Sequence, residues 1–171
     1  MRRLLLGVLF LAAAMVLGDT VLDACGSKFL VGARSARYQR LQTALHPSTI
    51  LFYWEDDPTT EEDDEASWAE VRAAIEKVGH RFEMATNRST FDSAVRAGKF
   101  EIIMMSLNEA RSRQTDVAAI APDSVLLPFV EFPTRPEYSK AKREFGQVLK
   151  IPATVSQLLS TIDKAQQSRG L

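Results

Sequence analysis

Nine residues in the middle of the chain constrain the fold more than any other stretch: Phe100-Glu-Ile-Ile-Met-Met-Ser-Leu-Asn108. Apolar residues occupy consecutive positions here, so the run lacks the alternating polar face of a half-exposed strand. A strand that is apolar on both faces is typical of a parallel sheet with helices on either side. We therefore expect residues 100–108 to form the central strand of such a sheet.

Strand-like and helix-like segments alternate around this run. Four more strands are predicted from their apolar, β-branched and aromatic residues, at 48–54, 81–85, 125–132 and 147–151. Pro128 argues against a central place for the fourth strand, because proline has no N–H for the ladder. The alternation predicts a single three-layer, doubly wound α/β domain with a five-stranded, mostly parallel sheet.

Polar residues that can cap a first turn predict where the helices begin. Three capping boxes, in which Ser or Thr precedes Glu or Gln by three residues, start at Ser67, Thr134 and Thr154, and Ser89-Thr-Phe-Asp92 resembles another cap. Glycines at 79, 98 and 146 predict helix ends. The acidic segment 55–65 is expected to be a loop, and the polar segment 108–120 a weakly periodic helix.

Composition and charge exclude several classes of protein. The 171 residues carry a formal net charge of -1, which gives no basic surplus for binding nucleic acid. Cys25 is the single cysteine, so neither an intramolecular disulfide nor a cysteine-rich zinc site can form. His46 and His80 have no neighbouring His or Cys in the sequence, and we expect neither to bind a metal or act in catalysis.

Residues 1–24 are typical of a signal peptide. Arg2 and Arg3 precede an apolar run that ends at Gly18, and its length of about fifteen residues is too short for a spanning helix. We therefore expect an exported protein of the bacterial cell envelope, either periplasmic or attached to the membrane.

Cys25 is a candidate for lipid attachment. Leu22-Asp-Ala-Cys25 resembles a bacterial lipobox, in which cleavage before the cysteine leaves that residue to carry lipid. Asp23 departs from the lipobox pattern. Cleavage after Gly18 or Ala24 by an ordinary signal peptidase would instead release a soluble protein, and the sequence leaves both outcomes open.

Residues 25–48 form a basic segment before the domain, and apolar residues at helical spacing predict a short amphipathic helix within it. Its cations are Lys28, Arg34, Arg37 and Arg40. This helix could pack on the domain with its arginines in solvent. Alternatively, the arginines could rest on the anionic headgroups of a membrane surface.

Three stretches carry a resemblance to a known family: Ile50-Leu-Phe-Tyr53 before acidic residues, Phe100-Glu-Ile-Ile-Met-Met-Ser106 in the middle, and Val148-Leu-Lys-Ile-Pro152 before the last helix. In this order they resemble the receiver domain of bacterial response regulators, a flavodoxin-like fold, over residues 49–168. The resemblance implies the strand order 2-1-3-4-5.

The same resemblance places the phosphoacceptor position of receivers at Ser106. Receivers carry an aspartate there, and a neutral hydroxyl is a poor phosphoryl acceptor without a base beside it. The lysine of receivers is matched by Lys150, which lies one residue out of register because Ile151 separates it from Pro152. We therefore expect a degenerate receiver without phosphotransfer by the family's mechanism.

The acidic pair with which receivers hold Mg²⁺ falls on Trp54 and Glu55, and two further acids follow directly. Glu55, Asp56 and Asp57 are therefore weak candidates for binding this cation, and the alternative is an ordinary solvated loop. Otherwise we expect no cofactor.

Three functions are compatible with these observations. The first is a non-enzymatic module that binds or scaffolds another protein, or a second copy of itself, through the surface where receivers pair. The alternative is a cytoplasmic or membrane-anchored phosphorelay receiver that uses a non-standard acid among residues 55–57. The third is a small hydrolase with Ser106 as the nucleophile.

Overall fold

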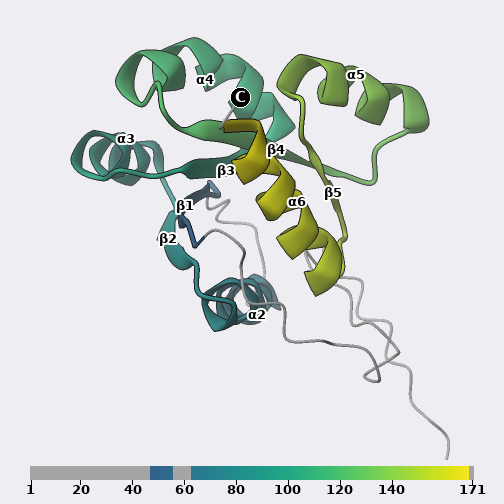
Figure 1. Ribbon diagram of the computed structural model, residues 1–171, viewed down its shortest axis with the longest axis horizontal. Helices are drawn as coiled ribbons and strands as arrows, with labels where there is room; N and C mark the ends of the chain where they lie inside the picture. The colour runs from purple at the N-terminus through teal and green to yellow at the C-terminus, as the bar shows by residue number, and fades with distance from the viewer. Residues whose placement is uncertain (1–46, 56–62, 170–171) are drawn as a thin grey trace, which may run out of the picture.

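The structure is a computed structural model that describes residues 47–55 and 63–169 (Figure 1). Strands and helices alternate throughout these ranges, in the order β1 (Thr49–Tyr53), α2 (Asp63–Lys77), β2 (Arg81–Ala85), α3 (Arg88–Ala97), β3 (Ile102–Ser106), α4 (Leu107–Ile120), β4 (Val125–Glu131), α5 (Arg135–Phe145), β5 (Leu149–Ile151) and α6 (Val155–Arg169).

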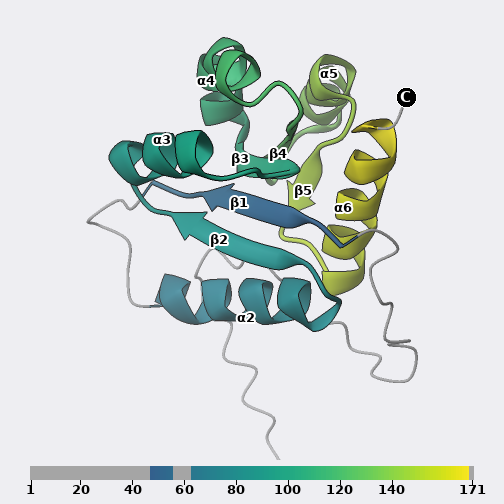
Figure 2. The same cartoon turned by 60° about the vertical axis from the view of Figure 1, so that its left-hand side comes forward.

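The described strands form one parallel sheet in the order β2-β1-β3-β4-β5. Helices α2 and α6 pack on one face of the sheet, and α3, α4 and α5 pack on the other (Figure 2). The predicted three-layer, doubly wound fold and its strand order are thereby confirmed.

Strand β3 lies in the middle of the sheet, between β1 and β4. Ile102 and Met104 belong to the core under α2 and α6, whereas Ile103 and Met105 belong to the core under α3 and α4. All four side chains are fully buried, and burial of each contributes about 1.5–3 kcal/mol. The predicted strand was too long at both ends, because β3 begins only at Ile102 and Leu107 already begins α4.

Pro128 does not force β4 to the edge of the sheet, because β4 pairs with both β3 and β5. The N–H of Val125 points to β3 and the N–H of Phe132 points to β5. Because these directions alternate along a strand, the nitrogen of Pro128 faces the β5 side. Strand β5 begins only at Leu149, opposite Phe129, so the missing N–H falls just before this ladder starts.

The predicted caps at Thr134 and Thr154 are confirmed. The Thr134 hydroxyl accepts from the backbone N–H of Glu137, and the Glu137 carboxylate accepts from the backbone N–H of Thr134. The same reciprocal pair joins Thr154 and Gln157. These bonds satisfy N–H groups that have no partner within the helix.

Two predicted caps were wrong. Helix α3 begins two residues before the predicted cap, at Asn87, whose side chain accepts from the backbone N–H of Thr90 at 2.9 Å. Asparagine caps as well as serine does.

The second wrong cap is Ser67, which lies inside α2. This helix begins at Asp63, so residues 63–65 are helical rather than part of the predicted loop. Acidic residues in a first turn favour helix formation through the helix dipole.

Several predictions concern residues outside the described ranges, namely the signal peptide at 1–24, Cys25, the basic segment up to residue 46, and Asp56 and Asp57 in the acidic segment. Among the described helices, none combines the length and the apolar composition needed to cross a membrane.

Candidate binding site

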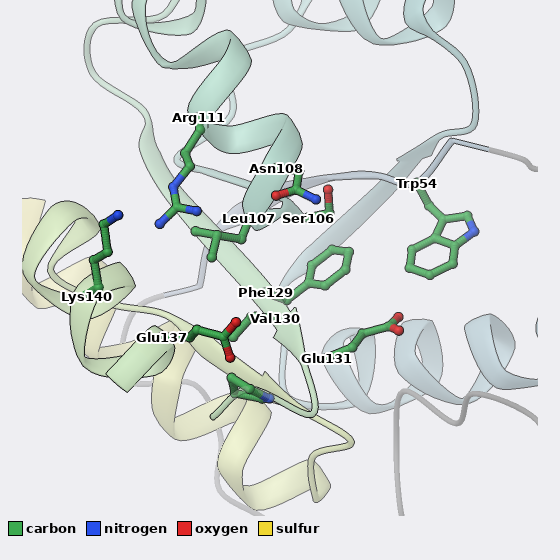
Figure 3. Close-up of a pocket in the computed structure, with 11 residues that line it drawn as sticks. Trp54, Ser106, Leu107, Asn108, Arg111, Phe129, Val130, Glu131, Glu137 and Lys140 are labelled. Atoms are coloured by element: carbon green, nitrogen blue, oxygen red, sulfur yellow. The ribbon is translucent and has the colours of Figure 1, made fainter. Parts of the chain in front are cut away.

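A hollow of about 580 Å³ lies at the carboxyl edge of the sheet (Figure 3). It is formed where β1, β3 and β4 end and where α4 and α5 begin, and it is lined by Trp54, Ser106, Leu107, Asn108, Arg111, Phe129, Val130, Glu131, Pro133, Glu137 and Lys140. Ligand sites of doubly wound sheets lie at this edge. Its volume is within the ~300–1,000 Å³ of typical binding pockets.

Aromatic side chains form one wall of the hollow. The indole of Trp54 stacks on the Phe129 ring at a centroid distance of 5.8 Å and an interplanar angle of 19°. It also contacts Trp68 of α2 at 4.6 Å. Phe129 in turn stacks on Phe52, at 5.5 Å and 10°. Trp54, which directly follows β1, is therefore part of an apolar cluster.

Ser106 ends β3 and caps α4. Its hydroxyl accepts a hydrogen bond from the backbone N–H of Glu109 at 3.2 Å. His80 precedes β2, at the amino edge of this parallel sheet, and Ser106 lies at the carboxyl edge. A histidine base for Ser106 is therefore lacking among the described residues.

The rim of the hollow is charged. Arg111 forms an ion pair with Glu144, in which Nη2 and Nε donate to Oε2 at 2.9 Å and 3.0 Å. This pair ties α4 to α5. Lys140 and Glu131 are exposed. Figure 3 shows Lys140 and Arg111 on one side of the hollow and Glu131 on the other. Glu137 also lines the hollow, but its carboxylate accepts from the backbone N–H of Thr134, and Arg111 is paired with Glu144. Lys140 and Glu131 are therefore the rim charges without an ion pair among the described residues.

A second polar cluster, centred on Arg113, joins α3, α4 and the end of β1. The Arg113 guanidinium donates to Glu109 at 2.6 Å and lies 3.7 Å from Asp92. It also lies 4.9 Å from the centroid of the Tyr53 ring. Only 12% of its side chain is exposed. These contacts fix α4 against the sheet and thereby position the cap at Ser106.

Tyr53 connects this cluster to the acidic segment. Burial raises the pKa of its hydroxyl, which Arg113 opposes, and a hydrogen bond with the Glu55 carboxylate raises the pKa further. Through this hydrogen bond Glu55 has a structural contact that the sequence did not indicate. Arg113 was likewise missed, although its spacing of four residues from Glu109 is the signal of a helical ion pair.

The described residues do not fit a magnesium site. Trp54 occupies one of the two positions after β1 that are acidic in receivers, and Ser106 offers a neutral hydroxyl. No three His, Cys, Asp or Glu side chains in the described part of the chain gather in a way that could hold a metal ion. The candidate Glu55 is exposed, while Asp56 and Asp57 lie outside that part.

Lys150 does not line the hollow. It lies in the middle of β5 with an exposed side chain, while Leu149 and Ile151 on either side of it are buried. Ser106 and Trp54 are thus the two predicted positions that the structure brings into one site.

Comparisons with known proteins bear on the fold. No model of a protein family matches the chain, and no curated protein matches it in sequence. A response regulator from Thermotoga maritima superimposes with a TM-score of 0.56 at 14% identity, covering 71% of this chain and 99% of that one.

Two further solved structures are similar. A response regulator from Burkholderia pseudomallei with a phosphorylated aspartic acid has a TM-score of 0.51 at 19% identity, covering 71% of each chain. An adenylate cyclase from Rhodopirellula baltica has a TM-score of 0.55 at 14% identity, covering 72% of this chain and 90% of that one. At these identities the likeness concerns the fold alone, and the described part of this chain has the fold of response-regulator receiver domains.

Proposed function

We propose that this chain is a non-enzymatic binding or scaffolding module of the bacterial cell envelope, built on a receiver fold that has lost its phosphoacceptor. The observation that carries the proposal is the role of Ser106, whose hydroxyl caps α4 at the acceptor position. The Ser106 hydroxyl accepts a hydrogen bond from the backbone, and within residues 47–55 and 63–169 no histidine lies beside it to activate it as a nucleophile.

The aromatic wall beside Ser106 supports the same conclusion. Phosphoryl transfer relies on positioned charge, in particular a divalent cation that neutralises the transferred group. Trp54 and Phe129 instead present an apolar surface. An open hollow with aromatic walls and a few charged groups on its rim suits the side chains of another protein better than a phosphoryl group.

The sequence of the first 24 residues supports a place in the envelope. A positive start followed by a short apolar run is typical of an export signal. The histidine kinases that load receivers use ATP in the cytoplasm, so an exported receiver would have no use for an acceptor. The proposal covers two forms of the mature protein. One is attached to the membrane through Cys25, and the other is soluble.

Incubation of the full chain with acetyl phosphate and Mg²⁺, followed by intact-mass measurement, tests the loss of phosphotransfer. We expect no phosphoryl adduct. Ser106→Asp is the matched control, because aspartate caps a helix as well as serine does and restores the acceptor carboxylate. An adduct on the wild-type chain would contradict the proposal and favour the phosphorelay alternative.

The place in the cell is tested separately by the intact mass of the protein recovered from its native cells. Loss of residues 1–24 with an added diacylglycerol group would establish a lipoprotein, and loss of a leader alone would establish a soluble exported protein. Recovery of the unprocessed chain in the cytoplasm would refute export.

A further inference from the structure

Phe132 is the most exposed large apolar side chain in the described part of the chain. It directly follows β4 and is 71% exposed, whereas the next such residue, Ile120, is 44% exposed. Phe132 lies between Glu131 and Pro133, both of which line the hollow at the carboxyl edge. An exposed aromatic residue therefore lies, in sequence, between two residues that line a cavity large enough to hold such a ring.

The backbone of Phe132 has a φ of 39°, and among the described non-glycine residues it is the one with a positive φ. Residues with a side chain rarely adopt this conformation, which costs about 1–3 kcal/mol. The N–H of Phe132 donates to the carbonyl of Ile151 at 3.0 Å, so the β5 ladder holds the turn in place. A strained residue that presents an aromatic ring to solvent indicates a functional contact for that ring.

Two charges on the rim of the hollow, Lys140 and Glu131, are placed so that they can pair with those of a second copy of the chain. Lys140 and Glu131 lie on opposite sides of the rim, and neither forms an ion pair within the ranges that the structure describes. A surface with both signs of charge on opposite sides is complementary to its own copy after a twofold rotation. An interface of this type closes as a dimer.

We propose that two copies of this chain pair at the carboxyl edge of their sheets, with Phe132 of each copy entering the hollow of the other. The ring would rest against Trp54, Val130 and Pro133, and Lys140 of each copy would face Glu131 of the other. The inference rests on the proposed binding function and specifies the partner as a second copy of the chain.

Sedimentation velocity of the full chain, at concentrations from ~1 to ~300 μM, tests this pairing. We expect a change from one to two copies in wild type, and a dissociation constant at least about tenfold higher in Phe132→Ala, since buried aromatic anchors dominate most interfaces. Ile120→Ala is the matched control, because it removes the other exposed large apolar side chain of the described residues and should leave the dissociation constant unchanged.

A charge exchange tests the geometry of the interface. Lys140→Glu and Glu131→Lys should each weaken self-association, because each variant places like charges opposite one another. An equimolar mixture of the two variants should regain pairing as a heterodimer. Restoration by mixing requires that the two rim charges face each other across the interface.

Three outcomes would overturn the proposal: a wild-type chain that stays monomeric throughout, self-association that is insensitive to Phe132→Ala, or a mixture of the charge variants that does not regain pairing. The first outcome would leave the proposed binding function intact with a different partner. That function fails instead on a phosphoryl adduct in the acetyl phosphate experiment, so the two failures are distinguishable.

Discussion

The backbone N–H of Ser48 donates a 3.0 Å hydrogen bond to Nδ1 of His80, and both residues are buried. Two more side chains hold the same end of β1, since Glu101 accepts from the backbone N–H of Thr49 and Gln166 donates to the Ser48 hydroxyl. Groups from three separate segments, namely the loops before β2 and β3 and helix α6, therefore fix the point at which the chain enters the sheet.

This contact predicts that stability falls in mild acid. Burial lowers the pKa of His80 below 6.5, an effect that Asp163 and Glu101 partly oppose. A lowered pKa in the folded state means that His80 contributes fully to the free energy of unfolding above pH 6.5. This contribution is lost as the pH falls through the folded-state pKa. A protonated Nδ1 cannot accept from Ser48. Urea unfolding at a series of pH values measures this decline.

His80→Gln provides the control for that prediction, because glutamine does not titrate. The difference in unfolding free energy between wild type and this variant should shrink as the pH falls below 6.5. A difference that is constant with pH would show that other groups cause the decline.

The cap at Ser106 predicts opposite results for two substitutions. Ser106→Ala removes the acceptor for the N–H of Glu109 and should cost about 1 kcal/mol of unfolding free energy. Ser106→Asp should cost little, because aspartate is an equally good cap and favours the helix dipole. Chemical denaturation measures both. Equal losses in the two variants would contradict a capping role.

The buried guanidinium of Arg113 should matter more for stability than the exposed one of Arg111. Arg113→Met leaves Glu109 and Asp92 without their shared cation and should cost about 1–3 kcal/mol. Arg111→Met removes an exposed pair with Glu144 and should have a much smaller effect, since solvent screens such pairs. Thermal or urea unfolding of both variants compares them directly, and a larger loss in Arg111→Met would contradict the ranking.

Phe132→Gly should stabilise the isolated chain. Glycine adopts a positive φ without strain, so the substitution should raise the unfolding free energy by about 1 kcal/mol or more. The measurement is urea unfolding at a concentration low enough to keep the chain monomeric, with Phe132→Ala as the comparison. A destabilised Phe132→Gly would show that the φ of 39° is not a source of strain.

Much of the fold could be predicted because the sheet is buried on both faces. The strand at 102–106 is apolar at four successive positions, and few structures other than a strand covered on both faces suit such a run. The caps at Thr134 and Thr154 were predictable because both members of each reciprocal pair are close in sequence. Helix α3 shows the limit of this approach, since Asn87 and Ser89 are both good caps and tertiary packing decides between them.

The candidate site was less predictable because its members come from distant segments. Trp54 and Phe129 stack across 75 positions of sequence, and no local pattern indicates that contact. The exposure of Phe132 also depends on a backbone turn that a short apolar strand does not encode. Ser106 was recognisable because the resemblance to receivers located its position, but its capping bond was not predicted.

The two edges of the sheet limit how other chains can attach. Strand β5 is three residues long with Lys150 exposed at its centre, and strand β2 carries exposed Arg81 and Glu83. Short, charged edge strands disfavour the addition of a further strand from another molecule. Growth into fibrils by extension of the sheet is therefore discouraged at both sides, which gives Lys150 a protective role that does not depend on phosphate chemistry.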